Sequence, residues 1–211
     1  MDVRKLRVFG IALIAIGTLV ACAESDDRWT YIERDARIGD ADAQLQLGLR
    51  YLYGNDIPKD SVQAKHWLEL SAAQHLAAGQ YYLAQLYLAQ HDAVSRAQAL
   101  ALLRAAHDGG ESMADHSLAE ILATSADGNR EDGQFAVGLL ETTLRDDTSA
   151  DADDFEVLAA AYARAGRFAE AVGAQRHAVS DEDCSCNKEL LRQRERRLET
   201  YQRGETWNEA L

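Results

Sequence analysis

Residues 41–54 read ADAQLQLGLRYLYG, in which Leu47-Gly48 is followed by Tyr51. The same pattern of leucine, a small residue and then a large one returns at Leu83-Ala84, Leu118-Ala119 and Leu158-Ala159. Repeat units of this length, one every 35 to 40 residues, are typical of helix pairs that cannot bury their apolar faces alone. The sequence therefore predicts an all-α fold, a solenoid of antiparallel helix pairs that share one core.

Helical periodicity and end signals predict where these pairs lie. Gly54 can end a helix in the left-handed conformation, and Asp60 with Gln63 has the form of a capping box for the next one. The expected pairs are 41–54 with 60–75, 78–90 with 93–107, 112–125 with 131–144, and 152–165 with 168–180. A last helix is expected at 187–203.

The first 21 residues have the three parts of an export signal. A basic start is followed by the apolar run Val8–Val20 and then by Ala21 and Cys22. As a helix, this run is too short for a hydrocarbon core of about 30 Å. We therefore divide the chain into a signal peptide (1–21), a capping helix (22–40), four helix pairs (41–180) and a C-terminal capping helix with its tail (181–211).

The residues Leu19-Val20-Ala21-Cys22 resemble the lipobox of bacterial lipoproteins. The resemblance implies that Cys22 is lipidated and becomes the new N-terminus, so that the membrane is contacted through this lipid only. Ala23 stands where an inner-membrane retention signal has aspartate, which implies an outer-membrane lipoprotein facing the periplasm. An ordinary signal peptide or a buried apolar helix are the alternatives.

The chain is strongly acidic. Its formal net charge is −13, and removal of residues 1–21 with their three basic residues and one acid leaves −15. Such a charge repels phosphate backbones, so we expect no nucleic-acid binding. Cationic or neutral partners remain allowed.

Residues 41–73 resemble a Sel-one-like repeat (SLR) nearly position for position. The shared positions are Ala41 to Gly48, Tyr51, Gly54, Ile57-Pro58-Lys59-Asp60, Ala64, Trp67 and Ala72-Ala73. Residues 77–106 resemble the same unit, 112–144 is a weaker copy, and 152–180 is similar to a tetratricopeptide (TPR) unit. The resemblance implies a right-handed α-solenoid that recognises proteins, usually without catalysis.

In the TPR architecture the first helix of each pair lines a concave groove. Carrying the exposed positions of those helices onto this chain defines the predicted groove: Leu45, Leu49, Tyr53, Tyr81, Gln85, His116, Glu120, Glu156 and Arg164. Its amino end is apolar and aromatic, which suits an extended peptide or an amphipathic helix, and its carboxyl end is polar and mostly acidic. Several of these side chains could instead pack between repeats.

We find no enzyme signature and no cofactor motif, and we expect a protein without catalysis. The six histidines form no i, i+4 pair, so no metal centre is expected. The acidic run from Asp146 to Glu156 lacks the glycine of a calcium loop, which favours helix capping and solvation. Catalytic groups assemble in space, however, and an envelope enzyme stays an alternative.

Two features near the C-terminus remain open. Cys184 and Cys186 are too close for an easy mutual disulfide, which leaves free thiols, intermolecular pairing or a loop without function. The basic stretch Lys188–Arg203 could attract an anionic partner. A solvated capping helix is the favoured interpretation, with Leu190, Leu191, Leu198 and Tyr201 closing the end of the solenoid.

Two functions of different classes follow. The first is a lipid-anchored periplasmic scaffold that binds a protein partner in the cell envelope. The second is a glycan or peptidoglycan binding module that stacks sugars on Trp29, Tyr81 and Tyr82. Sedimentation with protein-free sacculi would distinguish them.

Overall fold

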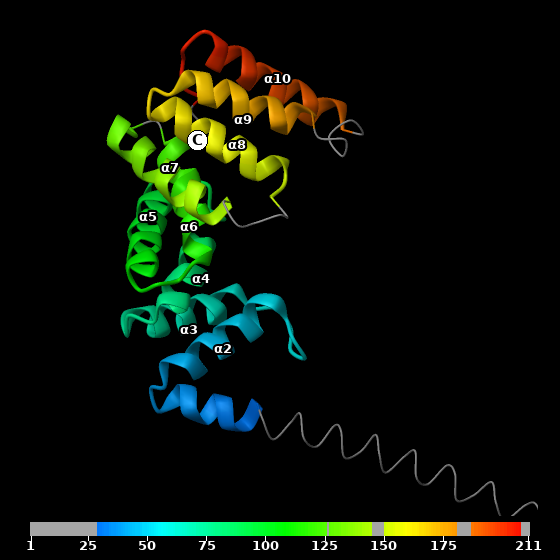
Figure 1. Ribbon diagram of the computed structural model, residues 1–211. Helices are drawn as coiled ribbons and strands as arrows, with labels where there is room; N and C mark the ends of the chain where they lie inside the picture. The colour runs from blue at the N-terminus through cyan, green and yellow to red at the C-terminus, as the bar shows by residue number, and fades with distance from the viewer. Residues whose placement is uncertain (1–28, 126, 145–149, 181–186, 208–211) are drawn as a thin grey trace, which may run out of the picture. The chain divides into compact units, whose positions relative to one another are not determined.

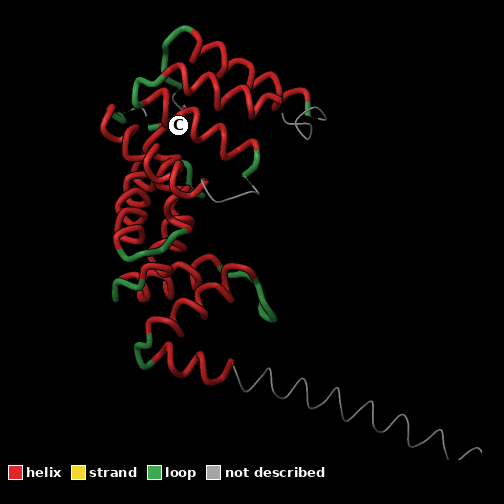
Figure 2. The backbone as a smooth tube through the Cα atoms, viewed as in Figure 1, coloured by secondary structure: helices red, strands yellow, loops and turns green. Residues whose placement is uncertain are grey.

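The computed structural model describes residues 29–125, 127–144, 150–180 and 187–207. Regular structure in these ranges is entirely helical (Figure 2). Residues 29–37 are helical and are followed by α2 (Ala41–Tyr53), α3 (Ser61–Ala73), α4 (Ala77–Leu88), α5 (Ala93–Asp108), α6 (Met113–Thr124), α7 (Arg130–Leu144), α8 (Ala152–Arg164), α9 (Phe168–Ser180) and α10 (Lys188–Gln202). The predicted all-α fold of helix pairs is confirmed, and α2 to α10 begin and end within two residues of the expected positions.

The chain divides into two compact units, and the boundary between them lies between Gly79 and Gln80, inside α4 (Ala77–Leu88). Unit 1 contains the helical residues 29–37, α2 and α3. Unit 2 contains α5 to α10 together with most of α4.

The helix ends in unit 1 follow from local chemistry. The Asp40 carboxylate accepts from the Ala43 N–H at 2.7 Å and begins α2. Gly54 adopts a φ of 75° and ends the same helix. The Asp60 carboxylate accepts from the N–H groups of Val62 and Gln63, which confirms it as the N-cap of α3.

Unit 1 has a small core between α2, α3 and the helical residues 29–37. Ala36, Ala43 and Leu47 are buried in it, with Tyr51 and Trp67 packed against them. Gly48 lets α2 and α3 approach closely, because a Cβ atom there would lie 2.8 Å from Leu68 Cγ. At Gly48, the small residue of the repeated pattern is therefore required by the close packing of the two helices.

Unit 2 stacks its helices around a larger core. Helix α6 packs on α5, α7 and α8, and α9 packs between α8 and α10 (Figure 1). Leu103, Leu118, Leu140 and Tyr201 are completely or almost completely buried in this core. Helix α10, which carries Tyr201, packs on α9, the second helix of the last pair.

Candidate functional site

A pocket of about 370 Å³ lies between α6, α8 and the C-terminal segment of unit 2. We call it the α6/α8 pocket. Its polar lining comes from His116, Glu120 and Thr124 of α6, Asp153 and Glu156 of α8, and Arg197 and Trp207 of the C-terminal segment. It brings together acidic, basic and aromatic side chains from parts of the chain that are far apart in sequence.

Helix geometry explains how α6 and α8 supply these groups. His116, Glu120 and Thr124 are spaced by four residues, so they share one face of α6. Helix α8 begins with a complete capping box, in which the Asp151 carboxylate accepts from the Asp154 N–H and the Asp154 carboxylate accepts from the Asp151 N–H. The capping role predicted for the acidic run is therefore confirmed, and it sets the start of the helix that carries Asp153 and Glu156.

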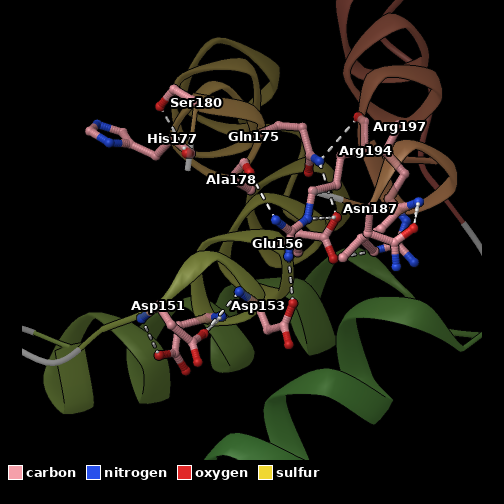
Figure 3. Close-up of polar contacts among 12 residues, drawn as sticks. Asp151, Asp153, Glu156, Gln175, His177, Ala178, Ser180, Asn187, Arg194 and Arg197 are labelled. Carbon is pink, nitrogen blue, oxygen red and sulfur yellow. Dashed lines mark hydrogen bonds and ion pairs between the residues drawn. The ribbon is translucent and has the colours of Figure 1, made fainter. Parts of the chain in front are cut away.

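A buried arginine connects α10 to this acidic helix (Figure 3). Arg194 Nη2 lies 2.6 Å from Asp153 Oδ1, and Arg194 Nε lies 3.2 Å from Glu156 Oε1. Arg194 Nη1 also donates to the Ala178 carbonyl at 3.1 Å. Only 4% of the Arg194 side chain is exposed. The interpretation of the basic stretch as a solvated helix is therefore wrong at Arg194, because tertiary contact with α8 and α9 removes this side chain from water.

Glu156 is mostly buried and has a second arginine beside it. Arg197 Nη1 lies 3.1 Å from Glu156 Oε2, so two guanidinium groups flank one carboxylate. Solvation was expected for the acidic run, and at Glu156 this expectation is wrong. A buried carboxylate needs such compensation, since its transfer out of water is costly.

The chain turns back after α10 and places Trp207 at the pocket. Gly204 adopts a φ of 73°, a conformation that glycine tolerates, at this turn. The Arg197 guanidinium carbon lies 5.3 Å from the centre of the Trp207 ring, within the range of a cation–π contact. Burial raises the pKa of the neighbouring Tyr201 hydroxyl, which therefore stays neutral.

The structure gathers three residues of the predicted groove in this pocket: His116, Glu120 and Glu156. His116 Nδ1 lies 3.2 Å from Asp154 Oδ1, and Glu156 is held by the arginines of α10. Arg197 and Trp207 were not among the predicted site residues. A turn brings Trp207 back to α6 and α8, and the only sequence signal for this turn is Gly204.

Arg164 is the fourth predicted groove residue from α6 and α8, and its guanidinium contacts the backbone. It donates to the carbonyl oxygens of Ala123, Ser125 and Gly128 at 3.1, 2.6 and 2.9 Å. Burial lowers the pKa of Arg164 from its usual value. The side chain therefore holds the end of α6 and the turn after it. A contact with a partner stays a prediction here.

The α4 residues of the predicted groove are also engaged within unit 2. Gln85 donates to the Ser117 hydroxyl at 2.9 Å. Tyr81 packs against the core and meets Tyr82 edge to face, with ring centroids 5.1 Å apart. Their binding role remains a prediction.

In unit 1 the predicted groove residues lie on α2. Leu45 and Leu49 are partly buried, whereas Tyr53 is 53% exposed. The ring of Trp29, proposed above for sugar stacking, has the Arg50 guanidinium 4.3 Å from its centre. Tyr53 is therefore the most accessible aromatic group among these residues.

A second, more apolar pocket of about 230 Å³ lies between α5, α6 and the turn before α7. Leu100, Ile121 and Leu122 supply apolar lining, and Arg104 and Asp132, which form an ion pair, also line the pocket. It contains none of the predicted groove residues.

The structure says little about the remaining predicted features. Cys22, Cys184, Cys186 and the acidic residues Asp146 and Asp147 lie outside the described residues. Within the described ranges, no group of three or more His, Cys, Asp or Glu side chains is arranged to hold a metal ion. Among the described helices, none combines the length and the apolar character needed to cross a membrane.

Comparisons with known proteins agree with this architecture. The Sel1 repeat family profile matches residues 41–76 and 77–110. A protective antigen of uropathogenic Escherichia coli that displays an SLR fold is 22% identical with a TM-score of 0.55, and the alignment covers 86% of this chain and 38% of that one. This chain thus spans well under half the length of that antigen, and the likeness concerns the fold alone.

A Sel1 repeat protein from Oxalobacter formigenes is 20% identical with a TM-score of 0.47, and the alignment covers 61% of this chain and 95% of that one. No curated protein sequence matches the chain. The repeated pattern, the helix pairs and the family profile lead to the same conclusion: the chain carries Sel1 repeats at residues 41–76 and 77–110, in an all-helical fold of the SLR type.

Proposed function

We propose that this protein is a lipid-anchored scaffold that binds a protein partner in the cell envelope. Sel1 repeats form a scaffold family that generally mediates protein–protein interactions. One observation carries the proposal for this chain. The faces of α6 and α8 that were predicted to line a groove border one open pocket, with charged side chains and an indole at its walls.

The chemistry of that pocket suits recognition of a partner. Its carboxylates Asp153 and Glu156 are fixed in place by ion pairs with arginines. Fixed charges and an aromatic wall are typical of a surface that selects a partner.

Photocrosslinking in intact cells tests the scaffold function. A photoreactive amino acid at Tyr53 in unit 1 or at His116 in unit 2 should capture the same envelope protein. Val62 on α3 and Val94 on α5 are matched control positions, since they are 76% and 71% exposed and lie on second helices. The proposal fails if all four positions capture the same proteins equally, or if none captures any.

Anchoring is proposed from Cys22 and the lipobox-like residues before it. We expect that Cys22→Ser abolishes incorporation of labelled palmitate and releases the protein from membranes, because no acylated N-terminus can form. Cys184→Ser is the matched control and should keep the label. Equal labelling of the two variants, or no labelling of the wild type, would contradict the anchor.

The outer membrane is proposed as the location because Ala23 follows Cys22. Separation of the membranes by density should place the wild-type protein in the outer-membrane fraction. An Ala23→Asp variant should move to the inner-membrane fraction. Recovery of both proteins in the inner membrane would overturn the assignment.

A further inference from the structure

The chain places a part of itself on the surface that was predicted to contact a partner. We call residues 204–207 the return segment, because the chain turns back at Gly204 after the end of α10. Its last residue, Trp207, lines the α6/α8 pocket together with His116, Glu120 and Glu156. These three are the predicted groove residues that the structure gathers there. An aromatic side chain of the protein itself therefore occupies part of the predicted binding surface.

The return segment is attached to the pocket by one side chain. Trp207 is partly buried against the apolar core of unit 2, and its ring centre lies 5.3 Å from the guanidinium carbon of Arg197. The N–H groups of Gly204 and Glu205 donate to carbonyl oxygens in the last turn of α10. Thr206 and Trp207 make no hydrogen bond with the described residues. The indole ring is therefore the anchor of the segment.

This anchor can be released at low cost. The Trp207 Nε1 atom is shielded from water and has no acceptor among the described residues. In water the same N–H would be hydrogen bonded, so detachment of the ring recovers a bond that the closed form lacks. Residues 202–205 are exposed, and Gly204 can adopt other backbone conformations, so the segment can swing away while α10 stays packed. Opening that breaks few contacts costs much less free energy than unfolding.

We propose that the return segment is a displaceable intramolecular ligand of the α6/α8 pocket, and that the partner protein competes with it by inserting an aromatic side chain. The competing group must fill the space that the indole leaves, and an aromatic ring does so while restoring the cation–π contact with Arg197. The segment is a strong competitor, because tethering gives it an effective concentration of about 1 mM or more. The inference rests on the proposed scaffold function and adds a closed form that the partner must open.

Hydrogen exchange in the mature full-length protein tests whether the segment detaches. We expect the Trp207 indole N–H to be at least about a hundredfold less protected than the amide N–H groups of Leu158 and Ala159, which are buried in α8. Detachment breaks one side-chain contact, whereas exposure of these α8 amides requires unfolding of unit 2. Equal protection of the indole and the α8 amides would show that Trp207 is a permanent part of the core, and it would overturn the inference.

A peptide added in trans tests whether the vacated site is a binding site. The probe is fluorescein-labelled Arg-Gly-Glu-Thr-Trp-Asn-Glu-Ala-Leu, the sequence of residues 203–211. We expect it to bind full-length Trp207→Ala at least about tenfold more tightly than the wild type, whose own segment competes. A probe with alanine in place of tryptophan should bind neither protein.

Glu205→Ala is the matched control, because it changes a residue of the same segment that is 58% exposed and keeps the indole. Its affinity for the probe should stay within about twofold of the wild-type value. Circular dichroism confirms that each variant is folded. Equal affinity of the probe for the wild type and Trp207→Ala, or no binding to Trp207→Ala at about 1 mM probe, overturns the inference.

Crosslinking in cells tests the competition and separates the two proposals. With the photoreactive amino acid at His116, capture of the envelope partner should rise at least about threefold in Trp207→Ala and stay unchanged in Glu205→Ala. Capture at His116 that is the same in both variants would keep the scaffold function and overturn the competition. Detachment and probe binding in the purified protein, without any position-specific crosslink in cells, would support the intramolecular ligand and remove the scaffold function.

Discussion

Replacement of Arg194 by alanine should lower the free energy of unfolding of unit 2 by about 3 kcal/mol. Arg194 is almost completely buried and contacts Asp153, Glu156 and the Ala178 carbonyl. Its removal leaves the mostly buried Glu156 with one arginine where it had two. Urea denaturation followed by circular dichroism measures the loss.

Arg192→Ala is the control, because Arg192 is two residues away on the same helix and is 65% exposed. Its ion pair with Glu189 is at the surface, so we expect a change below about 1 kcal/mol. Glu156→Gln in the Arg194→Ala background should restore part of the loss, since the buried negative charge is then gone. Similar effects of Arg194→Ala and Arg192→Ala would contradict the buried ion pair.

Gly133→Ala should destabilise unit 2 by about 2 kcal/mol, although alanine is a better helix former than glycine. A Cβ atom at Gly133 would lie 2.6 Å from the carbonyl carbon of Arg164 and closer still to the Ala165 nitrogen. These are backbone atoms, so α7 and α8 must move apart to make room. Thermal unfolding of the variant and the wild type gives the comparison.

Gly138→Ala on the same helix is the matched control. A Cβ atom at Gly138 meets nothing within 4 Å, so the substitution changes stability only through the higher helix propensity of alanine. Unit 2 should therefore gain up to about 1 kcal/mol of stability. If both substitutions shift the unfolding temperature in the same direction, close contact between α7 and α8 at Gly133 is refuted.

The order and the ends of the helices were predictable because the signals are local. Asp40, Asp60 and Asp151 each bond to N–H groups two or three residues ahead, and Gly54 ends α2 by its own conformation. The reciprocal half of the capping box predicted at Gln63 is not formed within the described residues, whereas Asp151 with Asp154 forms both halves. Local chemistry therefore predicts where a helix begins more reliably than which bonds are made there.

The candidate site was predictable only in part. Helical spacing placed His116 and Glu120 on one face, and the repeat resemblance aligned that face with Glu156 on α8. The partners of Glu156 could not be inferred, since they come from α10. The contacts of Arg164 with carbonyl groups about 40 residues earlier in the chain could not be inferred either, and its role in the groove stays a prediction.

By itself, the sequence determined the helical repeat class, the helix positions and the acidic character of the chain. The repeat class follows from a pattern that recurs every 35 to 40 residues, the helix positions follow from signals one or two helical turns apart, and the charge follows from composition alone. Only the tertiary structure decided which charged side chains are buried. Asp153 and Arg194 are separated by 41 positions, and their contact exists because α9 packs between α8 and α10. The α6/α8 pocket has the same origin, since its walls come from three regions of the chain that meet only after the helices have stacked.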